Sequence, residues 1–189
     1  MLTEPERIEI RRLWDRRRQH DAQNLPQAQR HRNLWPVSAE FLSALAAGAG
    51  VKRILEVGGS SGLSTIALAA AARETGGKVV TIELEPTRQA EARQTMVRLG
   101  LEAYVEFHQG DAGAILPTLG EFDFVFIDCE KDDYIRFFDL LHLAPGALVV
   151  ADNVISHSLT EYSAHVRQRP GTESITLPVG EGLEVTRMA

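Results

Sequence analysis

Cysteine is almost absent from this sequence. The 189 residues include one cysteine, Cys129, which excludes an intramolecular disulfide and a multi-cysteine zinc site. Long apolar runs are also missing, and a membrane-spanning helix needs roughly 20 such residues. Residues 1–18 are charged where a signal peptide has an apolar core. These absences predict a cytoplasmic protein without a membrane anchor.

The overall composition is that of a packed globular protein. Hydrophobic residues make up 44% of the chain and charged residues 24%, which disfavours disorder, collagen and coiled coil. The length suits one α/β domain better than two. We therefore expect a single domain over residues 1–189, with an N-terminal helix and arm over 1–36 and the core over 37–189.

Charge is distributed unevenly along the chain. The net charge is −6, yet residues 1–35 hold eight arginines against five acidic residues, so this segment carries +3 and the remainder −9. A basic segment on an acidic body can contact RNA or an anionic substrate. The favoured interpretation is a solvated helix whose charges pair locally.

The N-terminal third has helix signals separated by a polar stretch. Thr3 can cap a first helix that has Pro5 in its first turn and Glu6 three residues on, and this helix should end near His20. Residues 21–36 are polar and contain two prolines, which predicts an irregular arm. Ser38 is expected to open a second helix that ends at residues 48–50.

From residue 53 onward, short apolar runs alternate with helical segments. The runs have the length and β-branched content of buried parallel strands. They cover residues 53–57, 78–82, 104–108, 122–127 and 147–151. The intervening helical segments cover residues 63–73, 86–99, 112–116 and 132–143, and a further one follows at 160–168.

This alternation predicts an α/β protein with a doubly wound, mostly parallel sheet. Two further short runs, residues 174–177 and 183–186, flank the turn Gly180-Glu181-Gly182 and predict a hairpin. The sheet should therefore have seven strands and end in an antiparallel C-terminal hairpin strand. In such sheets, ligands bind at the carboxyl ends of the strands.

Small residues follow the first strand in the segment Gly58-Gly59-Ser60-Ser61-Gly62. They let the backbone approach a ligand closely. A dinucleotide fingerprint needs glycine at positions 60 and 63, where this chain has Ser60 and Leu63. A phosphate-binding P-loop needs a lysine before Ser or Thr at the helix start, and none is present. The turn therefore predicts a different class of ligand.

Acidic side chains around this turn favour a cationic ligand. Glu56, at the mouth of the turn, would repel a pyrophosphate but suits the sulfonium and ammonium groups of S-adenosylmethionine. Glu83, 25 residues after Gly58, can accept both hydroxyls of a ribose. Asp111-Ala112 can meet an adenine edge. Alternatively, Glu56 caps a neighbouring helix, Glu83 is a surface charge, and Asp111 is a helix N-cap.

These motifs resemble those of the catechol and caffeoyl-coenzyme A O-methyltransferases and their bacterial relatives. ILEVGGSSGLSTIALA is similar to the family's first motif, VVTIELEP to its second and GDAGAILP to its third, and the resemblance extends over residues 34–187. It implies a Rossmann-like class I methyltransferase fold, S-adenosylmethionine as cofactor, a small-molecule acceptor and a homodimer. The cofactor-binding residues that it implies are Glu56, Gly58, Ser60, Gly62, Ser64, Glu83, Asp111 and Ala112.

Two further segments predict a metal site. FIDCEKDDY places Asp128 at the end of one strand, and VVADNV places Asp152 and Asn153 at the end of the next. Adjacent parallel strands bring these oxygens together, and such a set suits Mg²⁺, or Ca²⁺ or Mn²⁺. The resemblance implies that Lys131 is the general base or stabilises a phenolate, and that Asp128 shares in catalysis. The alternatives are an ordinary turn at Asp152-Asn153 and a surface lysine.

The sequence also departs from the family. Glu130 stands where aspartate is usual. In relatives, an insertion between the ADNV segment and the next helix often covers the substrate, whereas here only residues 155–159 separate Val154 from that helix. The acceptor pocket should therefore be more open. We expect metal-dependent methylation of a hydroxyl oxygen on a catechol-like or other small phenolic acceptor. One alternative is O-methylation of a modified tRNA base, with phosphates bound by Arg16, Arg17, Arg18, Arg30 and Arg32. Another is a non-catalytic S-adenosylmethionine-binding protein.

Overall fold

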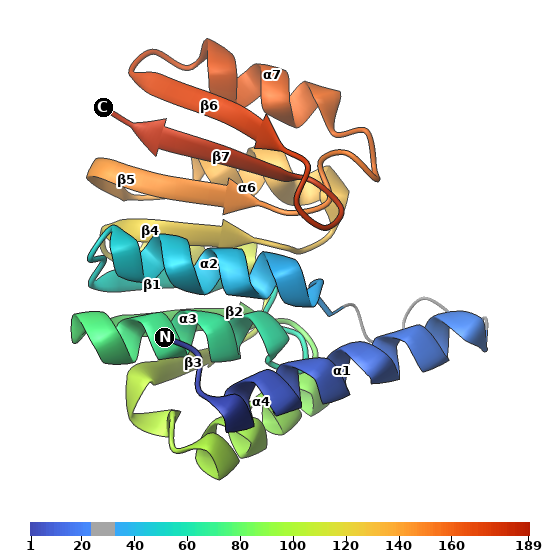
Figure 1. Ribbon diagram of the computed structural model, residues 1–189. Coiled ribbons are helices and arrows are strands. Elements are labelled where there is room, and N and C mark those ends of the chain that lie inside the picture. The colour runs from blue at the N-terminus through green and yellow to red at the C-terminus, as the bar shows by residue number, and fades with distance from the viewer. Residues whose placement is uncertain (24–32) are drawn as a thin grey trace.

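The computed structural model describes residues 1–23 and 33–189, and a seven-stranded sheet runs through its centre (Figure 1). The strand order is β3-β2-β1-β4-β5-β7-β6. The strands are β1 (Arg53–Val57), β2 (Lys78–Glu83), β3 (Val105–Gln109), β4 (Phe122–Ile127), β5 (Leu143–Ala151), β6 (Thr172–Leu177) and β7 (Leu183–Met188). Strands β1 to β5 pair in parallel, whereas β7 is antiparallel to both β5 and β6. The predicted fold class is confirmed.

Helices cover both faces of the sheet. They are α1 (Glu4–Ala22), α2 (Pro36–Gly48), α3 (Leu63–Thr75), α4 (Pro86–Leu99), α5 (Ala112–Ile115), α6 (Tyr134–Asp139) and α7 (Thr160–Gln168). In Figure 1, α2 and α3 lie in front of the sheet and α6 behind it. Within the described ranges, none of the helices combines the length and the apolar composition that crossing a bilayer requires.

The alternation of side chains along each strand divides the core into two parts. Ile54 and Phe124 belong to the core under α1, α2 and α3, whereas Leu55 and Val125 belong to the core under α6 and α7. Successive residues of a strand point to opposite faces, so each central strand must be apolar on both sides. This is why these strands appear in the sequence as continuous apolar runs.

The start of α2 and the end of α6 differ from the prediction. The second helix begins at Pro36, with Trp35 as its N-cap, rather than at Ser38, because proline suits the first turn of a helix. The helix predicted over 132–143 ends at Asp139, and Leu143 already belongs to β5. The register between β4 and β5 shifts after Phe122, which accommodates the Pro-Gly pair within β5.

Ion pairs attach α1 to the three helices beside it. Arg7 pairs with Glu40 of α2, Glu6 with Arg73 of α3, and Arg98 of α4 with Glu9. Arg16 pairs with Glu91 of α4 as well. Apolar contact adds to this docking, because Ile10 and Leu13 of α1 are 2% and 0% exposed. The predicted solvated helix with locally paired charges is found only in part, because Arg12 and Arg17 pair within α1 with Glu9 and Asp21 whereas the pairs above bind the helix to the core.

Glu6 is the most buried acid of this contact. Its side chain is 2% exposed, accepts from the backbone nitrogen of Thr3 at 2.7 Å and pairs with Arg73. We predict that Glu6→Gln destabilises the protein by about 1–2 kcal/mol, since bonds between charged groups are lost and Arg73 is partly solvated. Urea unfolding measures this difference. Glu4→Gln, at an exposed pair with Arg11, serves as the matched control and should change stability by less than about 0.5 kcal/mol.

The same contact predicts a loss of stability in acid. Burial raises the pKa of Glu6, but Arg73 and the Thr3 amide more than offset this and leave the pKa below its ordinary value. Hydrogen bonding to Arg12 likewise lowers the pKa of Glu9. The stabilisation is therefore complete above the ordinary glutamate pKa of about 4.3 and is lost as pH falls through the lowered values. The urea midpoint should fall less between pH 7 and pH 3 in a Glu6→Gln, Glu9→Gln double variant than in wild type.

Candidate functional site

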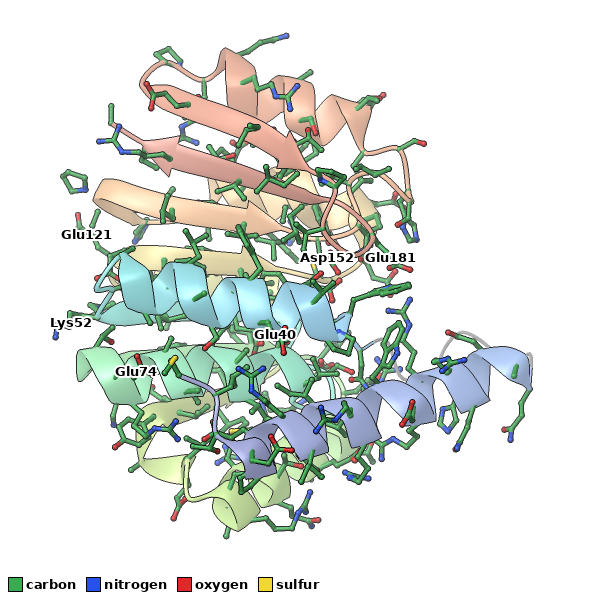
Figure 2. The ribbon with its side chains drawn as sticks, in the orientation of Figure 1. Glu40, Lys52, Glu74, Glu121, Asp152 and Glu181 are labelled. Atoms are coloured by element: carbon green, nitrogen blue, oxygen red, sulfur yellow. The ribbon has the colours of Figure 1, made fainter. Side chains whose placement is uncertain are left out.

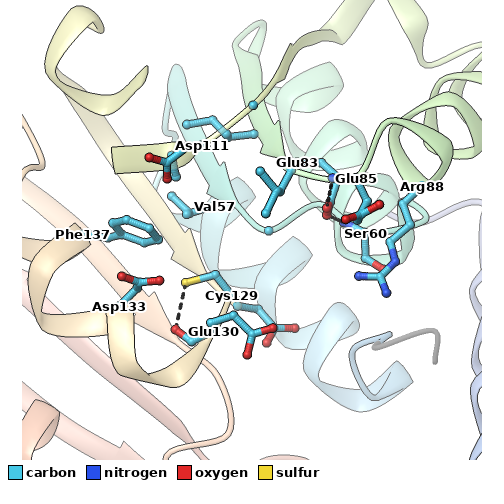
Figure 3. Close-up of a pocket in the computed structure, with 16 residues that line it drawn as sticks. Val57, Ser60, Glu83, Glu85, Arg88, Asp111, Cys129, Glu130, Asp133 and Phe137 are labelled. Atoms are coloured by element: carbon cyan, nitrogen blue, oxygen red, sulfur yellow. Dashed lines mark hydrogen bonds between the residues drawn. The ribbon is translucent and has the colours of Figure 1, made fainter. Parts of the chain in front are cut away.

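A cavity of about 330 Å³ opens at the carboxyl ends of β1, β2, β3 and β4 (Figure 3). Val57 and Gly58, Ile82 and Glu83, Gly110, and Asp128 line it from these strand ends, and Phe137 of α6 adds an aromatic wall. Cys129 also lines it, and burial raises the pKa of its thiol, so the thiolate is disfavoured. A cavity of this size suits a small organic ligand.

The turn after β1 forms one wall of this cavity. Gly58 has φ +95°, and a Cβ at this residue would lie 2.1 Å from the backbone oxygen of Asp128. Glycine is therefore required for both backbone conformation and space. Ser60 also has a positive φ of 46°, and its backbone nitrogen donates to Oε2 of Glu83 at 2.7 Å. Oγ of Ser60 is buried and has no hydrogen-bond partner within the described ranges, so it remains available for a ligand.

Glu83 lines the cavity at the end of β2, where the sequence places it. Its Oε2 accepts from Ser60, and its Oε1 accepts from the backbone nitrogen of Glu85 at 2.9 Å. A carboxylate offers about four acceptor positions, so two remain after these bonds. The predicted acceptance of two ribose hydroxyls is compatible with this geometry and stays a prediction.

Glu56 lies beneath the glycine turn, rather than at its mouth as expected. It is 0% exposed, and its Oε2 accepts from Thr65 at 2.6 Å and from Thr81 at 2.5 Å. Burial raises the pKa of Glu56, an effect that hydroxyls of neighbouring side chains partly offset. Its Oε1 is buried and has no hydrogen-bond partner among the described residues.

The other predicted cofactor residues divide into two groups. Asp111 and Ala112 line the cavity, and Asp111 is also the N-cap of α5, accepting from the backbone nitrogen of Gly113 at 3.0 Å. Both interpretations of Asp111 therefore fit the structure. Gly62 and Ser64 are buried at the start of α3 and, like Glu56, are not among the described residues that line the cavity. Their predicted contact with a cofactor stays a prediction.

The predicted metal residues converge beside this cavity. Nζ of Lys131 donates to Oδ1 of Asp128 at 3.0 Å and to Oδ1 of Asn153. It also donates to the hydroxyl of Tyr134 at 2.7 Å, and that hydroxyl donates to the backbone oxygen of Asp152 at 3.2 Å. Asp128 lines the cavity as well, so the two parts of the site share this residue.

Asp152 provides a test of whether these residues fit a metal ion. It is 1% exposed, and its Oδ1 has no hydrogen-bond partner in the described part of the chain. Burial, and then the charge of Asp128, raise the pKa of Asp152 to about 8. A cation bound there would relieve this cost, and oxygen donors suit Mg²⁺. Among the described residues, no group of three or more His, Cys, Asp or Glu is placed to hold a metal ion by itself, so such a site depends on the amide of Asn153.

Three contributors to this region were not predicted from the sequence. Tyr134 is buried under Lys131, and its i+3 spacing from the lysine is the only sequence signal. Glu181, in the turn before β7, accepts from Nδ2 of Asn153. Asn33 joins α1 to the glycine turn, because its Nδ2 donates to the backbone oxygen of Leu13 at 2.9 Å and its Oδ1 accepts from Ser61 at 2.8 Å.

The arginines considered for RNA binding have acidic partners in part. Arg16 pairs with Glu91, and Arg17 pairs with Glu181 at 3.0 Å and with Asp21 at 3.5 Å. Arg30 and Arg32 lie outside the described residues. These pairs stabilise the contact of α1 with the core, which favours a structural role over RNA binding for these two side chains.

Comparison with known proteins identifies the family. A model described as O-methyltransferase matches residues 16–188. The chain belongs to this family. A catechol O-methyltransferase from Niastella koreensis is 41% identical over 127 residues, covering 64% of this chain and 57% of the relative. A catechol O-methyltransferase from Mycobacterium tuberculosis is 42% identical over 120 residues, covering 61% and 54%.

A solved structure supports the same family. The O-methyltransferase from Bacillus cereus in complex with SAH superposes with a TM-score of 0.80 at 25% identity, covering 100% of this chain and 93% of that one. The matches to the two catechol O-methyltransferases span only a little over half of each relative's length.

Gly58 offers a test of the cavity wall. We predict that Gly58→Ala destabilises the protein by more than about 2 kcal/mol and weakens SAH binding at least tenfold, because the new methyl group collides with Asp128. Calorimetry measures both effects.

Gly100→Ala is the matched control for this variant. Gly100 ends α4 at φ +66°, and a Cβ there meets nothing within 4 Å. Gly100→Ala should lower the free energy of unfolding by about 1–2 kcal/mol through backbone strain alone and leave SAH affinity unchanged. Equal SAH affinity in the Gly58 variant and in this control would contradict the assignment of the cavity.

Proposed function

We propose that this protein transfers the methyl group of S-adenosylmethionine to a hydroxyl oxygen of a catechol-like or other small phenolic acceptor, with the help of a divalent cation. The observation that carries the proposal is the convergence of Asp128, Asp152 and Asn153, together with Lys131, at the edge of a cavity that Asp128 itself lines. Membership of the O-methyltransferase family supports the reaction class.

The cavity has features that suit S-adenosylmethionine. Glu83 keeps free acceptor positions for ribose hydroxyls, and Phe137 and Ala112 supply apolar surface for an adenine ring. The acidic lining of Glu83, Asp111 and Asp128 suits a cationic ligand and disfavours a pyrophosphate. The Bacillus cereus relative with SAH supports the same ligand class.

Methyl transfer needs an acceptor oxygen that loses its proton and is held in line with the sulfonium methyl group. A divalent ion held by Asp128, Asp152 and Asn153, with Mg²⁺ the first choice and Ca²⁺ or Mn²⁺ possible, would orient vicinal hydroxyls and lower their pKa. Lys131, whose Nζ lies between the oxygens of Asp128 and Asn153, is placed as an ammonium to stabilise the phenolate, and it would act as the general base only in its neutral form.

Apolar surface beside the metal residues suits an aromatic acceptor. Trp35 and Ile155 are 39% and 51% exposed. Both flank the turn that carries Glu181: a Cβ at Gly180 would lie 3.2 Å from Trp35, and one at Gly182 would lie 2.4 Å from Ile155. Trp35 also stacks at a tilt on Trp14, with ring centroids 4.7 Å apart. The names of the two catechol O-methyltransferases support a catechol-like acceptor.

The remaining properties are part of the same proposal. We infer a single domain over residues 1–189, because α1 packs into a core on one face of the single sheet and both cores reach β7. A homodimer and a cytoplasmic location stay predictions, based on the family resemblance and on the single cysteine respectively.

A methyl-transfer assay tests the proposal. Purified protein is incubated with S-adenosylmethionine labelled in its methyl group and with catechols, flavonoids or bulk tRNA, each with and without EDTA. We expect label on a catechol-type acceptor and its loss with EDTA. Transfer that persists in EDTA would contradict the metal-dependent mechanism, and labelling of tRNA alone would favour the nucleic-acid alternative. Cofactor binding without transfer to any acceptor would favour a non-catalytic protein.

Lys131→Met tests the role of the lysine. We predict that turnover falls about 10²- to 10⁴-fold, as expected when a proton-transfer group is removed, while affinity for S-adenosylmethionine stays within about twofold. Lys52→Met is the matched control, because Nζ of Lys52 donates to the backbone oxygen of Thr75 at an exposed position. Near-normal turnover in Lys131→Met would remove Lys131 from the mechanism.

A further inference from the structure

The turn between β6 and β7 reaches the predicted metal residues. Oε2 of Glu181 accepts from Nδ2 of Asn153. The backbone of this turn also bonds to the segment after Asn153: Val154 donates to Gly182 at 3.0 Å, and Ser156 donates to Glu181 at 3.1 Å. Figure 2 shows Asp152 and Glu181 at the carboxyl-terminal end of the sheet. Glu181 is thus held where it can act on the side chain of Asn153.

Glu181 and Lys131, the two neighbours of the Asn153 amide, are compatible with only one orientation of this amide. A carboxylate can only accept hydrogen bonds and an ammonium group can only donate them. Glu181 therefore requires the NH₂ group of Asn153 on its side, while Lys131 requires Oδ1 on the opposite side. If the amide turned over, its NH₂ group would point at the position proposed for the cation and repel it. The orientation of this amide thus decides whether Asn153 can be a metal ligand.

The backbone of Asn153 restrains this side chain further. Asn153 has φ +63°, a left-handed conformation that asparagine tolerates better than most residues. The residue is 6% exposed, so water has little access to its amide. Glu181 is therefore the main partner for the Asn153 NH₂ group among the described contacts.

Arg17 of α1 holds Glu181 from its other side. Its guanidinium donates to Oε1 of Glu181 at 3.0 Å and to the backbone oxygen of Asn33 at 2.6 Å. The two side chains of the pair are 18% and 21% exposed. The guanidinium also lies 5.0 Å from the ring centre of Trp14. Its contacts with Asn33, Trp14 and Asp21 thus fix Arg17, and Arg17 in turn fixes the carboxylate of Glu181.

We propose that Glu181 is a positioning residue, which orients the amide of Asn153 for the cation, and that Arg17 locks Glu181 in place. This proposal rests on the metal-dependent function proposed above. It makes the N-terminal helix part of the support of the metal site, although the two lie at opposite ends of the sequence. Partners that orient a ligand in this way typically change metal affinity 10- to 100-fold when they are removed.

Mn²⁺ binding to the full chain, followed by electron paramagnetic resonance, tests the proposal without an acceptor. We expect Glu181→Ala to weaken Mn²⁺ binding about 10- to 100-fold. Glu181→Gln should lose only a few-fold, because its amide oxygen can still accept from Asn153. The Mn²⁺ affinity of Arg17→Gln should lie between those of Glu181→Gln and wild type. Affinity for S-adenosylmethionine should change less than twofold in all three variants.

Arg16→Gln is the matched control. Arg16 is the neighbour of Arg17 on α1 and also forms a partly buried ion pair, but with Glu91 of α4, away from Asn153. Its Mn²⁺ affinity should equal that of wild type. A loss as large as that of Arg17→Gln would show that looser docking of α1 is responsible and would overturn the locking role. Unchanged Mn²⁺ affinity in folded Glu181→Ala, or in folded Glu181→Gln if the alanine variant does not fold, would overturn the positioning role.

A second measurement separates this proposal from the metal itself. In the metal-free protein, the side-chain NH₂ resonances of ¹⁵N-labelled Asn153 should exchange slowly with water and should shift and exchange faster in Glu181→Ala. If wild type binds no Mn²⁺, the proposed metal-dependent function is wrong. The resonances of Asn153 then still test the orientation of its amide. Identical shifts and exchange rates in wild type and variant would overturn the proposal in either case.

Discussion

Two acids, Asp128 and Asp152, come together at the ends of adjacent parallel strands, so either a proton or a nearby positive charge must offset their mutual repulsion. The parallel pairing of β4 with β5 fixes the positions of these two acids relative to each other, because Ile127 and Ala151 are opposite each other and the acids follow them directly. Lys131 provides one cation, bonded to Asp128. The oxygen of Asp152 that lacks a partner among the described residues, and the raised pKa of this acid, indicate that one lysine does not balance the pair. The rest of the site is arranged around this local excess of negative charge.

The docking of α1 also reduces the negative charge near Asp128 and Asp152. Arg17 comes from α1 and neutralises Glu181, which would otherwise add a third negative charge near Asp128 and Asp152. Asn33 connects the same region to the glycine turn through Ser61. Residues of the N-terminal segment thus contact both the glycine turn and the turn that carries Glu181. This gives the positive charge of Arg17 a structural use.

The sequence predicts those parts of the site that depend on strand ends. Each central strand is a continuous apolar run, so its end is visible, and the residues after it must meet at one edge of the sheet. This placed Asp128, Lys131, Asp152 and Asn153 together. The depth of Glu56 was misjudged, although strand alternation indicates it: Glu56 lies within β1, between Leu55 and Val57 of the opposite face, and so points toward α3. The bond from Arg17 to Glu181 joins residues 164 positions apart, and no periodic pattern records such a pair.

Gly58 and Asp128 are the point at which the two parts of the site meet. The space that a Cβ of Gly58 would need is occupied by the backbone oxygen of Asp128, so the glycine turn packs directly on the end of β4. The backbone nitrogen of Asp128 in turn donates to the backbone oxygen of Val57 at 2.9 Å. The cavity wall and the first predicted metal ligand are therefore joined by direct backbone contact. Because the proposed methyl transfer depends on holding two groups in line at short range, this contact would help to keep cofactor and acceptor aligned.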